Sequence, residues 1–453
     1  MKVAVVGSSH GGFETVRGVL HDFHDAEIDW YEKGDFVSFL SCGIELYLQG
    51  VVKDVNSVSY ATIDGMEAKG VHVHINSEVT SVNPEAHTIK VVDVTNGTET
   101  ESKYDKLVLS VGAVPFELPV PGKDLKNIYA MRGRDWAILL KKAEVDPEIE
   151  NVAVIGSGYI GIEAAESFAK AGKKVTIIDR NPTILGTYLD PEFTDILTKE
   201  LESQGISIKT SQSVKEFIGN DADQVTSLVT TTGETIPTDL VIEAAGIRPA
   251  TEWLKDTLKL DDHGLIVTDE YQETSQPDIF AVGDATEIEF APTGTKKLIA
   301  LAPNARRQGR SAAYNLNEKR RKTTAVSGSS ALHVYDYKFA STGLKDVTAK
   351  QMGLDVESVL VTDTKVPSFV PAEYNAEVYF KLTFDPRTRE VLGAQIMSKL
   401  DVTANINAIS LAIQKHMTID ELAYADFFFQ PGFDRPWSVM NIAAQQAQDK
   451  LAK

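Results

Sequence analysis

The sequence predicts an α/β fold with two similar nucleotide-binding domains, followed by an α+β C-terminal domain. The first observation is a strand, a glycine-rich turn and a helix at the N-terminus, a pattern that recurs from Val152 onward. The second is that no such turn follows residue 324, where strands and a long helix take over. A glycine-rich turn between strand and helix is typical of Rossmann-like dinucleotide-binding domains, since it lets the backbone approach a pyrophosphate.

Length and composition exclude several classes of protein. The 453 residues exceed the roughly 100–200 of one domain, so several domains are expected. The 45 basic and 65 acidic residues give a net charge of −20, which argues against a nucleic-acid partner. Only one cysteine is present, which excludes an intrachain disulfide and a cysteine-rich metal site. No apolar run is long enough for a signal peptide or a membrane span, so a cytoplasmic protein without a membrane partner is expected.

The first glycine-rich unit begins with the strand Lys2–Val6 and continues into a helix over about Phe13–Phe23. The second strand, Ile28–Tyr31, ends at Glu32, whose carboxylate is placed to accept hydrogen bonds from ribose hydroxyls. The turn is slightly irregular, because Ser9 stands where the middle glycine usually occurs. A tight turn without a ligand is the alternative interpretation.

The second unit has a complete fingerprint, Gly156, Gly158 and Gly161, between the strand Val152–Ile155 and a helix that ends near Ala171. The next strand, Lys174–Ile178, ends at Asp179. A carboxylate there favours the free 2′-hydroxyl of NADH over the 2′-phosphate of NADPH. The neighbouring Arg180 weakens that preference, because an arginine can receive a phosphate.

Further elements follow from alternating or continuous apolar runs. The predicted strands are Val71–Ile75, Thr88–Val92, Lys106–Ser110, Leu240–Ala245, Ala376–Phe384 and Val391–Ser398, with a helix over about Ala404–Lys415. The loop Pro115–Lys123 carries three prolines and is typical of an interdomain connection. We therefore predict domains over residues 1–119, 120–247, 248–323 and 324–453, with 1–119 and 248–323 being two parts of one domain.

The single cysteine, Cys42, precedes a helix expected to start near Ser41, and a helix N-terminus favours the thiolate. A small buried hydrophobic residue is the alternative. An enzyme that moves electrons from nicotinamide needs an outlet, and one thiol can cycle between thiolate and sulfenic acid. That chemistry makes a peroxide the natural substrate, with a mixed disulfide to a small thiol as the other option.

His10 is unusual because phosphate-binding turns do not require histidine. A neutral imidazole there could hold a peroxide or carry its proton, and the helix dipole disfavours the cation. Glu14 follows one helical turn later and is a possible neighbour. A histidine merely tolerated in the turn is the alternative.

These motifs resemble the FAD-dependent pyridine nucleotide-disulfide oxidoreductases, NADH peroxidase closely and NADH oxidases and coenzyme A-disulfide reductases more loosely. The similarity runs along the whole chain. Its most specific parts are Gly7–Gly12, Trp30–Cys42, Gly156–Ala165, Asn405–Ile413 and Leu422–Phe433, and the segment Thr274–Asp284 resembles the family's flavin signature.

The resemblance implies FAD in the first site and NADH in the second. No metal site is expected. The expected FAD residues are Gly7, Ser8, Ser9, Gly11, Gly12, Glu32, Ser110, Val111, Gly112, Ala113, Arg132, Asp284 and Ala302. The expected NADH residues are Gly156, Gly158, Tyr159, Ile160, Gly161, Asp179, Tyr188, Gly246, Ala300 and Ala331. Tyr159 resembles the aromatic residue that covers the flavin until nicotinamide displaces it. Pro303 and Ala331 depart from the expected threonine and glycine.

The resemblance also implies that Arg306 pairs with Glu14 beside His10, and that a partner subunit packs its Phe427–Pro431 segment over the flavin. The latter predicts a homodimer or homotetramer with a C-terminal dimerisation (interface) domain. An ordinary aromatic core is the alternative for this segment.

The resulting prediction is an NADH peroxidase that reduces hydrogen peroxide through Cys42, with His10, Glu14 and Arg306 in the active site. The first alternative is a water-forming NADH oxidase, which shares Cys42 and His10. A coenzyme A-disulfide reductase is disfavoured, because Ser41 stands where that group has asparagine. A non-catalytic NADH-sensing flavoprotein is a third alternative. His72 and His74 are expected on a surface strand without a paired carboxylate.

Overall fold

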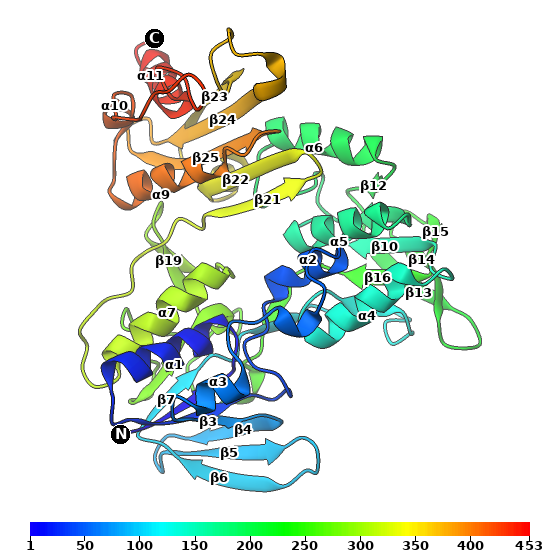
Figure 1. Ribbon diagram of the computed structural model, residues 1–453, viewed down its shortest axis with the longest axis vertical. Helices are drawn as coiled ribbons and strands as arrows, with labels where there is room; N and C mark the ends of the chain where they lie inside the picture. The colour runs from blue at the N-terminus through cyan, green and yellow to red at the C-terminus, as the bar shows by residue number, and fades with distance from the viewer.

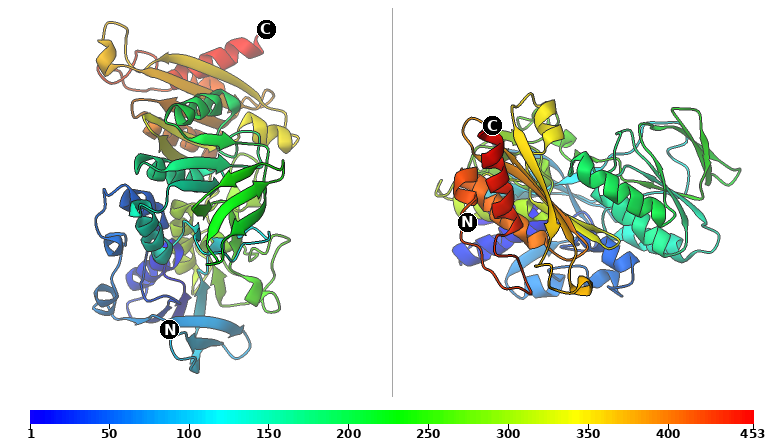
Figure 2. Two further views of the ribbon diagram at one scale, coloured as in Figure 1. Left: turned by 90° about the vertical axis from the view of Figure 1, so that its right-hand side faces the viewer. Right: turned by 90° about the horizontal axis from the view of Figure 1, so that it is seen from above.

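The computed structural model describes residues 1–453 and has the predicted α/β architecture, with two Rossmann-like sheets and a C-terminal α+β unit. The C-terminal unit, yellow to red in Figure 1, lies at the end of the long axis opposite the N-terminus. The two parallel sheets lie side by side below it, and Figure 2 shows how elongated the arrangement is. None of the helices is both long enough and apolar enough to span a membrane.

The first sheet has five parallel strands in the order β18-β7-β1-β2-β3. Their bounds are β1 Lys2–Val6, β2 Glu27–Tyr31, β3 Val71–His74, β7 Lys106–Leu109 and β18 Ile279–Ala281. One face is covered by two helices that pack on each other, α1 (His10–Asp22) and α7 (Ala302–Asn315). A short helix α3 (Ile63–Glu67) precedes β3, and an antiparallel meander follows it, β4 Ser77–Asn83, β5 Thr88–Asp93 and β6 Glu99–Lys103.

Helix α1 begins at His10, three residues before the predicted start at Phe13. Its first turn includes Gly11 and Gly12, and a Cβ at Gly12 would lie only 1.9 Å from the Gly7 carbonyl oxygen. The glycines therefore belong to the helix that crosses tightly over β1, which the sequence pattern alone did not distinguish from a turn. His10 is consequently the first residue of the helix.

The second sheet has the order β12-β11-β10-β16-β9 and is also parallel. Its strands are β9 Ile128–Ala130, β10 Asn151–Ile155, β11 Lys174–Ile178, β12 Ser207–Lys209 and β16 Leu240–Glu243. The associated helices are α4 Arg134–Val145, α5 Tyr159–Lys170 and α6 Pro191–Ser203. A small sheet joins β13 Val214–Gly219, β14 Val225–Thr230 and β15 Thr235–Pro237.

The chain passes between the two parallel sheets twice, through a two-stranded antiparallel ribbon of β8 (Ala113–Pro115) and β17 (Ile247–Pro249). The expected interdomain loop Pro115–Lys123 starts in this ribbon. The first sheet thus takes β18 and α7 from a segment that follows the second sheet in sequence. The four domain boundaries themselves stay a prediction.

The C-terminal unit is an antiparallel sheet in the order β21-β22-β25-β24-β23. Its strands are β21 Ser330–Val334, β22 Tyr337–Gly343, β23 Glu357–Thr364, β24 Glu377–Phe384 and β25 Val391–Ser398. Its helices are α8 Asp346–Gln351, α9 Ile406–Gln414, α10 Ile419–Leu422 and α11 Val439–Leu451. The remaining elements are α2 Ile44–Leu48, β19 Ile288–Phe290 and β20 Thr295–Lys297, with short 3-10 turns between them.

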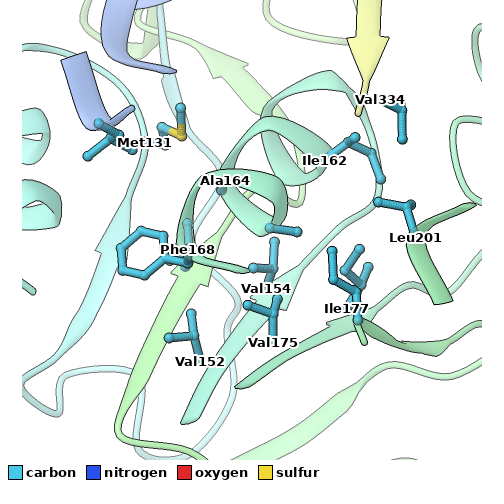
Figure 3. Packing of buried hydrophobic residues seen from close by; sticks show 14 of the residues in the cluster. Met131, Val152, Val154, Ile162, Ala164, Phe168, Val175, Ile177, Leu201 and Val334 are labelled. Carbon is cyan, nitrogen blue, oxygen red and sulfur yellow. The ribbon is translucent and has the colours of Figure 1, made fainter. Parts of the chain in front are cut away.

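The largest buried cluster draws side chains from all three units. It centres on Phe168 and Ile162 of α5, which lie over the second sheet in Figure 3. Ile44 of α2 enters it from the first nucleotide-binding half, and Val334 enters it from β21. Figure 3 shows Val334 beside Ile162. The favourable free energy of burying apolar side chains is roughly proportional to the apolar area removed from water. This shared core therefore holds the three units together as one packed body.

A buried cation links the second sheet to the C-terminal unit. The Lys381 side chain is 4% exposed, and its Nζ lies 3.1 Å from Asp190 Oδ2, 2.8 Å from Glu192 Oε1 and 2.9 Å from Asp346 Oδ2. Asp190 is fully buried and also accepts a 2.7 Å hydrogen bond from Gln395 Nε2. A buried charge is tolerated when it is paired and hydrogen-bonded, as this one is.

The histidines of β3 are paired, contrary to the prediction. His74 Nε2 lies 2.7 Å and His72 Nδ1 3.5 Å from Asp29 Oδ1 on the neighbouring strand. The Lys2 ammonium lies 2.9 Å from Asp29 Oδ2 and 3.0 Å from Glu27 Oε1. The pairing of parallel strands β1, β2 and β3 brings these residues together, so Asp29 is the centre of a network of polar contacts across three strands.

We predict that Lys381→Met lowers the free energy of unfolding by about 3–5 kcal/mol, because it leaves the Asp190 carboxylate buried without its cation. Equilibrium urea unfolding of the native chain and the variant measures this difference. The control is Lys255→Met, which breaks an exposed pair with Glu252 and is expected to change stability little. A Lys381→Met chain as stable as the native one would contradict the role assigned to this cation.

Candidate active site

A first cavity of about 810 Å³ opens along the carboxyl end of the first sheet. Many of the residues predicted to hold FAD line it: Gly7, Ser8, Ser9, Glu32, Ser110, Val111, Gly112, Ala113 and Arg132. Gly11, Gly12, Asp284 and Ala302 do not line it, and Gly11 and Gly12 lie buried in the first turn of α1. Loops at the carboxyl ends of parallel strands are where such folds bind nucleotides.

The glycine turn of this cavity is set by close backbone approach. Gly7 has φ +96°, and a Cβ there would lie 2.2 Å from the Ser110 carbonyl oxygen. The Trp30 indole N–H donates a 3.0 Å hydrogen bond to the Gly7 carbonyl and fixes the turn on the sheet. Only glycine fits at this position.

A second cavity of about 490 Å³ lies at the carboxyl end of the second sheet. Eight residues predicted to bind NADH line it: Gly156, Gly158, Tyr159, Ile160, Asp179, Tyr188, Gly246 and Ala300. Gly161 lies beneath it, where a Cβ would come within 1.9 Å of the Gly156 carbonyl oxygen. Ala331 does not line the cavity, and its neighbour Ser330 makes the contact with this site.

Two tyrosine rings stack inside the second cavity. Tyr159 and Tyr188 have ring centroids 3.8 Å apart at 17°, and the Tyr159 hydroxyl lies 2.7 Å from Ser330 Oγ of β21. Burial raises the pKa of Tyr159, so the phenol stays protonated. Both rings line the cavity together with Asp179 and Ser41.

The two cavities share Ser41 and Arg132 in their linings. Ser41 Oγ accepts a hydrogen bond of 3.1 Å from the Gly133 amide, which joins the cysteine loop to the start of α4. Arg132 Nη2 donates a hydrogen bond of 3.0 Å to Asp284 Oδ2. Asp284 lines neither cavity, but it contacts this arginine, which lines both. Cys42 directly follows Ser41 in the chain, although it lines neither cavity itself.

Cys42 sits in a 3-10 turn, Ser41–Gly43, that leads into α2. We expected a helix N-terminus to lower the pKa of Cys42 and favour its thiolate, but the largest effect on this pKa acts in the opposite direction. Although the residue is exposed, desolvation by surrounding protein raises the pKa of the Cys42 thiol, opposed by a backbone hydrogen bond and the Arg306 charge. This raised pKa favours the protonated thiol over the thiolate at neutral pH.

His10 lies in a group with Glu14, Tyr60 and Arg306. Burial, followed by the Arg306 charge, lowers the pKa of His10, so the imidazole is neutral. Arg306 Nη1 lies 3.2 Å from Glu14 Oε2, and its guanidinium carbon lies 4.2 Å from the Tyr60 ring centroid. His10 does not hydrogen-bond Glu14. His10 Nδ1 and Arg306 Nη2 are both buried without a hydrogen-bond partner.

Sequence analysis missed three residues of this region. Ser41 was noted only as the neighbour of Cys42, and nothing in the sequence marked Tyr60. Glu163, one helical turn after Tyr159, has a pKa raised to about 8 by burial and by the carboxylates of Glu45 and Glu166. Its i+4 spacing from Tyr159 was a signal that could have found it. Its charge, when present, also raises the pKa of Cys42.

Comparison with known proteins identifies the family. Residues 1–309 match the family described as "Pyridine nucleotide-disulphide oxidoreductase", and residues 329–439 match its dimerisation domain. The chain belongs to the pyridine nucleotide-disulphide oxidoreductase family. An NADH oxidase of Enterococcus faecalis is 39% identical over 452 residues, covering 100% of both chains. An NADH oxidase of Lactococcus lactis is 34% identical over 99% of this chain and 100% of its own.

Solved structures agree with this assignment. The water-forming NADH oxidase from Lactobacillus brevis, bound to NADH, has a TM-score of 0.96 and 38% identity, covering 100% of this chain and 99% of that one. An NAD-dependent persulfide reductase from A. fulgidus has a TM-score of 0.94 at 29% identity, over 99% of this chain and 83% of that one. This oxidoreductase is therefore a flavin-dependent enzyme that uses FAD and NADH, and its dimerisation domain indicates an oligomer.

We predict that Gly12→Ala and Gly161→Ala separate the two cofactors of this oxidoreductase. Each adds a Cβ within 1.9 Å of a backbone oxygen, so the affected turn must move. Gly12→Ala is expected to lose FAD, read as visible absorbance of the purified protein. Gly161→Ala is expected to keep FAD and lose NADH binding by at least about tenfold in Kd. Each variant is the other's control, and loss of FAD from both would contradict the assignment of the cavities.

Proposed function

We propose that this oxidoreductase reduces hydrogen peroxide with NADH, by the reaction NADH + H⁺ + H₂O₂ → NAD⁺ + 2 H₂O. One observation carries the proposal: His10 Nδ1 and Arg306 Nη2 are buried and unpartnered beside the loop that holds Cys42. Buried polar atoms without partners are costly, so this group suits a polar substrate. Hydrogen peroxide offers two donors and two oxygen acceptors, whereas dioxygen has no donor.

The reaction depends on moving one proton off the cysteine. Since desolvation raises the pKa of Cys42, the neutral His10 is the base that accepts the thiol proton. The thiolate then attacks one peroxide oxygen, the O–O bond breaks, and the leaving hydroxide takes the proton back from His10 as water. Cys42 is left as sulfenic acid, the reversible first step of thiol oxidation.

Arg306 and Glu14 position the substrate in this proposal. The Glu14 carboxylate holds one guanidinium nitrogen of Arg306 at 3.2 Å, and the Tyr60 ring lies against its face. The second nitrogen, Nη2, stays free to donate to a peroxide oxygen. FAD, when bound, would supply the two electrons of NADH; with two protons, one of them from solvent, they return Cys42 from sulfenic acid to the thiol and release the second water.

A water-forming NADH oxidase is the second candidate, with the reaction 2 NADH + 2 H⁺ + O₂ → 2 NAD⁺ + 2 H₂O. The names of the relatives favour it: the two sequences at 39% and 34% identity are NADH oxidases, and the Lactobacillus brevis structure is water-forming. It uses the same chain residues, because a peroxide formed from oxygen can be reduced at Cys42. The two candidates differ in which acceptor starts the cycle.

We also propose that a second copy of the chain covers the Phe427–Pro431 segment. Phe428 is 70% and Phe429 48% exposed, so the aromatic-core alternative does not describe them. They lie in a stretch without helix or strand between α10 and α11, inside the dimerisation domain. An exposed run of aromatic side chains is typical of a subunit interface.

The acceptor is tested by mixing the purified holoenzyme with NADH without oxygen and then adding hydrogen peroxide. If the enzyme is a peroxidase, one NADH is consumed for each hydrogen peroxide added. The loss of NADH absorbance measures this consumption. The oxidase predicts slow anaerobic turnover, and rapid turnover in air with two NADH consumed for each O₂. Negligible anaerobic turnover with peroxide, together with rapid turnover in air, would overturn the peroxidase.

Cys42→Ser is expected to lower peroxide turnover by at least roughly a thousandfold, as removal of a catalytic nucleophile does. FAD absorbance should be retained, because Cys42 lines neither cavity. A sulfenic-acid probe such as dimedone should add one label to the native chain after peroxide treatment and none to the variant. A native chain that turns over peroxide but never acquires the label would contradict the sulfenic-acid cycle.

A further inference from the structure

One face of the first sheet carries two histidines and two carboxylates close together. Parallel pairing places Asp29 of β2 beside His72 of β3, and Glu27 of β2 beside Lys2 of β1. Alternate residues of a strand point to the same face of a sheet, so Glu27 and Asp29 project together, as do His72 and His74. The apolar residues between them pack under α1 and α7, which leaves this polar group on the opposite face. Imidazoles and carboxylates therefore meet where the edge strand β3 pairs with β2.

Three of these side chains are close enough to bind one cation. One donor atom each from Glu27, Asp29 and His72 lies within 4.8 Å of the other two. A tetrahedral zinc ion with ligands at about 2.0–2.1 Å needs ligand atoms about 3.3–3.5 Å apart. The Glu27 and His72 side chains are 51% and 58% exposed, so they can rotate by the small amount that separates the two geometries. Carboxylate oxygen and imidazole nitrogen are both ordinary zinc ligands.

The Asp29 carboxylate is the fixed member of this group. Its side chain is only 5% exposed, and Oδ2 is buried without a hydrogen-bond partner of good geometry. The other oxygen, Oδ1, is hydrogen-bonded to His74 Nε2 at 2.7 Å, and the His74 ring stacks on Tyr31 with centroids 4.6 Å apart. Hydrogen bonds of this kind orient the ligands of metal sites. Asp29 Oδ2 is therefore a buried and oriented acceptor that faces Glu27 and His72.

A cation already marks the position between the two carboxylates. The Lys2 Nζ atom lies 2.9 Å from Asp29 Oδ2 and 3.0 Å from Glu27 Oε1. The Lys2 side chain is 32% exposed and has a flexible four-carbon stem, so its ammonium group can turn into solvent. A divalent ion at this position would keep both carboxylate contacts and add a bond to His72. Lys2 is consequently a competitor for the position and not a barrier to it.

We propose that Glu27, Asp29 and His72 form a site for a divalent transition-metal ion, for which Zn²⁺ is the fitting probe. The ion displaces the Lys2 ammonium, a water molecule completes the tetrahedron, and His74 holds the Asp29 carboxylate in place. The site joins β2 to β3. None of its residues lines the cavities assigned to FAD and NADH, so the proposal does not depend on the electron acceptor.

The test is calorimetric titration of Zn²⁺ into the metal-stripped, FAD-loaded protein. The titration uses a Cys42→Ser background, because the one thiol of the chain is a competing zinc ligand. One site per chain is expected. His72→Ala should weaken it by at least about tenfold, and His74→Ala by about ten- to a hundredfold. Lys2→Met should tighten binding by about two- to tenfold, because it removes the competing cation.

His87→Ala is the matched control for these variants. His87 is also a part-exposed histidine near a carboxylate, with Nε2 3.9 Å from Asp278 Oδ2, but it belongs to no such cluster. Its removal should leave the zinc affinity unchanged. Zinc binding that survives His72→Ala, or that Lys2→Met does not tighten, would overturn the proposal. Loss of binding in His72→Ala with retention in His87→Ala supports it.

Chemical protection tests the native chain without any substitution. Diethylpyrocarbonate acylates accessible imidazoles, and mass spectrometry of peptides locates the modified histidines. Zn²⁺ should slow the modification of His72 at least about tenfold and leave that of His87 unchanged, since a metal-bound nitrogen cannot react. Equal modification of His72 with and without Zn²⁺ would show that this imidazole is not a ligand and would overturn the site.

Discussion

The arrangement of the two nucleotide cavities depends on the wall that they share, which is formed by Ser41 and Arg132. A nicotinamide and a flavin exchange electrons only when their rings meet, so two separately folded sheets must hold their cavities in register. The cysteine loop, the start of α4 and Asp284 converge on this wall through the Ser41–Gly133 and Arg132–Asp284 hydrogen bonds. Cys42 follows Ser41 of this wall directly in the chain.

The C-terminal unit supplies much of the rigidity that this register requires. Lys381 binds Asp190 and Glu192 at the start of α6, and Ser330 bonds the Tyr159 hydroxyl. His333 of β21 lies 3.1 Å from Glu45 of α2 and 3.5 Å from Glu166 of α5, and these carboxylates raise its pKa to about 10. The histidine is therefore charged at neutral pH and joins α2, α5 and β21 in one ion network.

Burial and the Arg306 charge set the protonation of Cys42 and His10. Desolvation keeps the proton on the Cys42 sulfur and off the His10 ring, while the Arg306 charge acts on both in the direction of the thiolate and the neutral imidazole. The shifts therefore favour a thiol on Cys42 and a neutral imidazole on His10.

The sequence by itself determined the two glycine turns, the strands around them and the acidic residues that end β2 and β11, because positive φ angles and close backbone approach are local requirements. It also marked Cys42 and His10. Only the tertiary structure decided the start of α1 at His10, the pairing of His72 and His74 with Asp29, the raised pKa of Cys42 and the contact of Ser330 in place of Ala331. Each of these depends on groups far apart in the chain, and burial and charge at such contacts exist only after the sheets have packed.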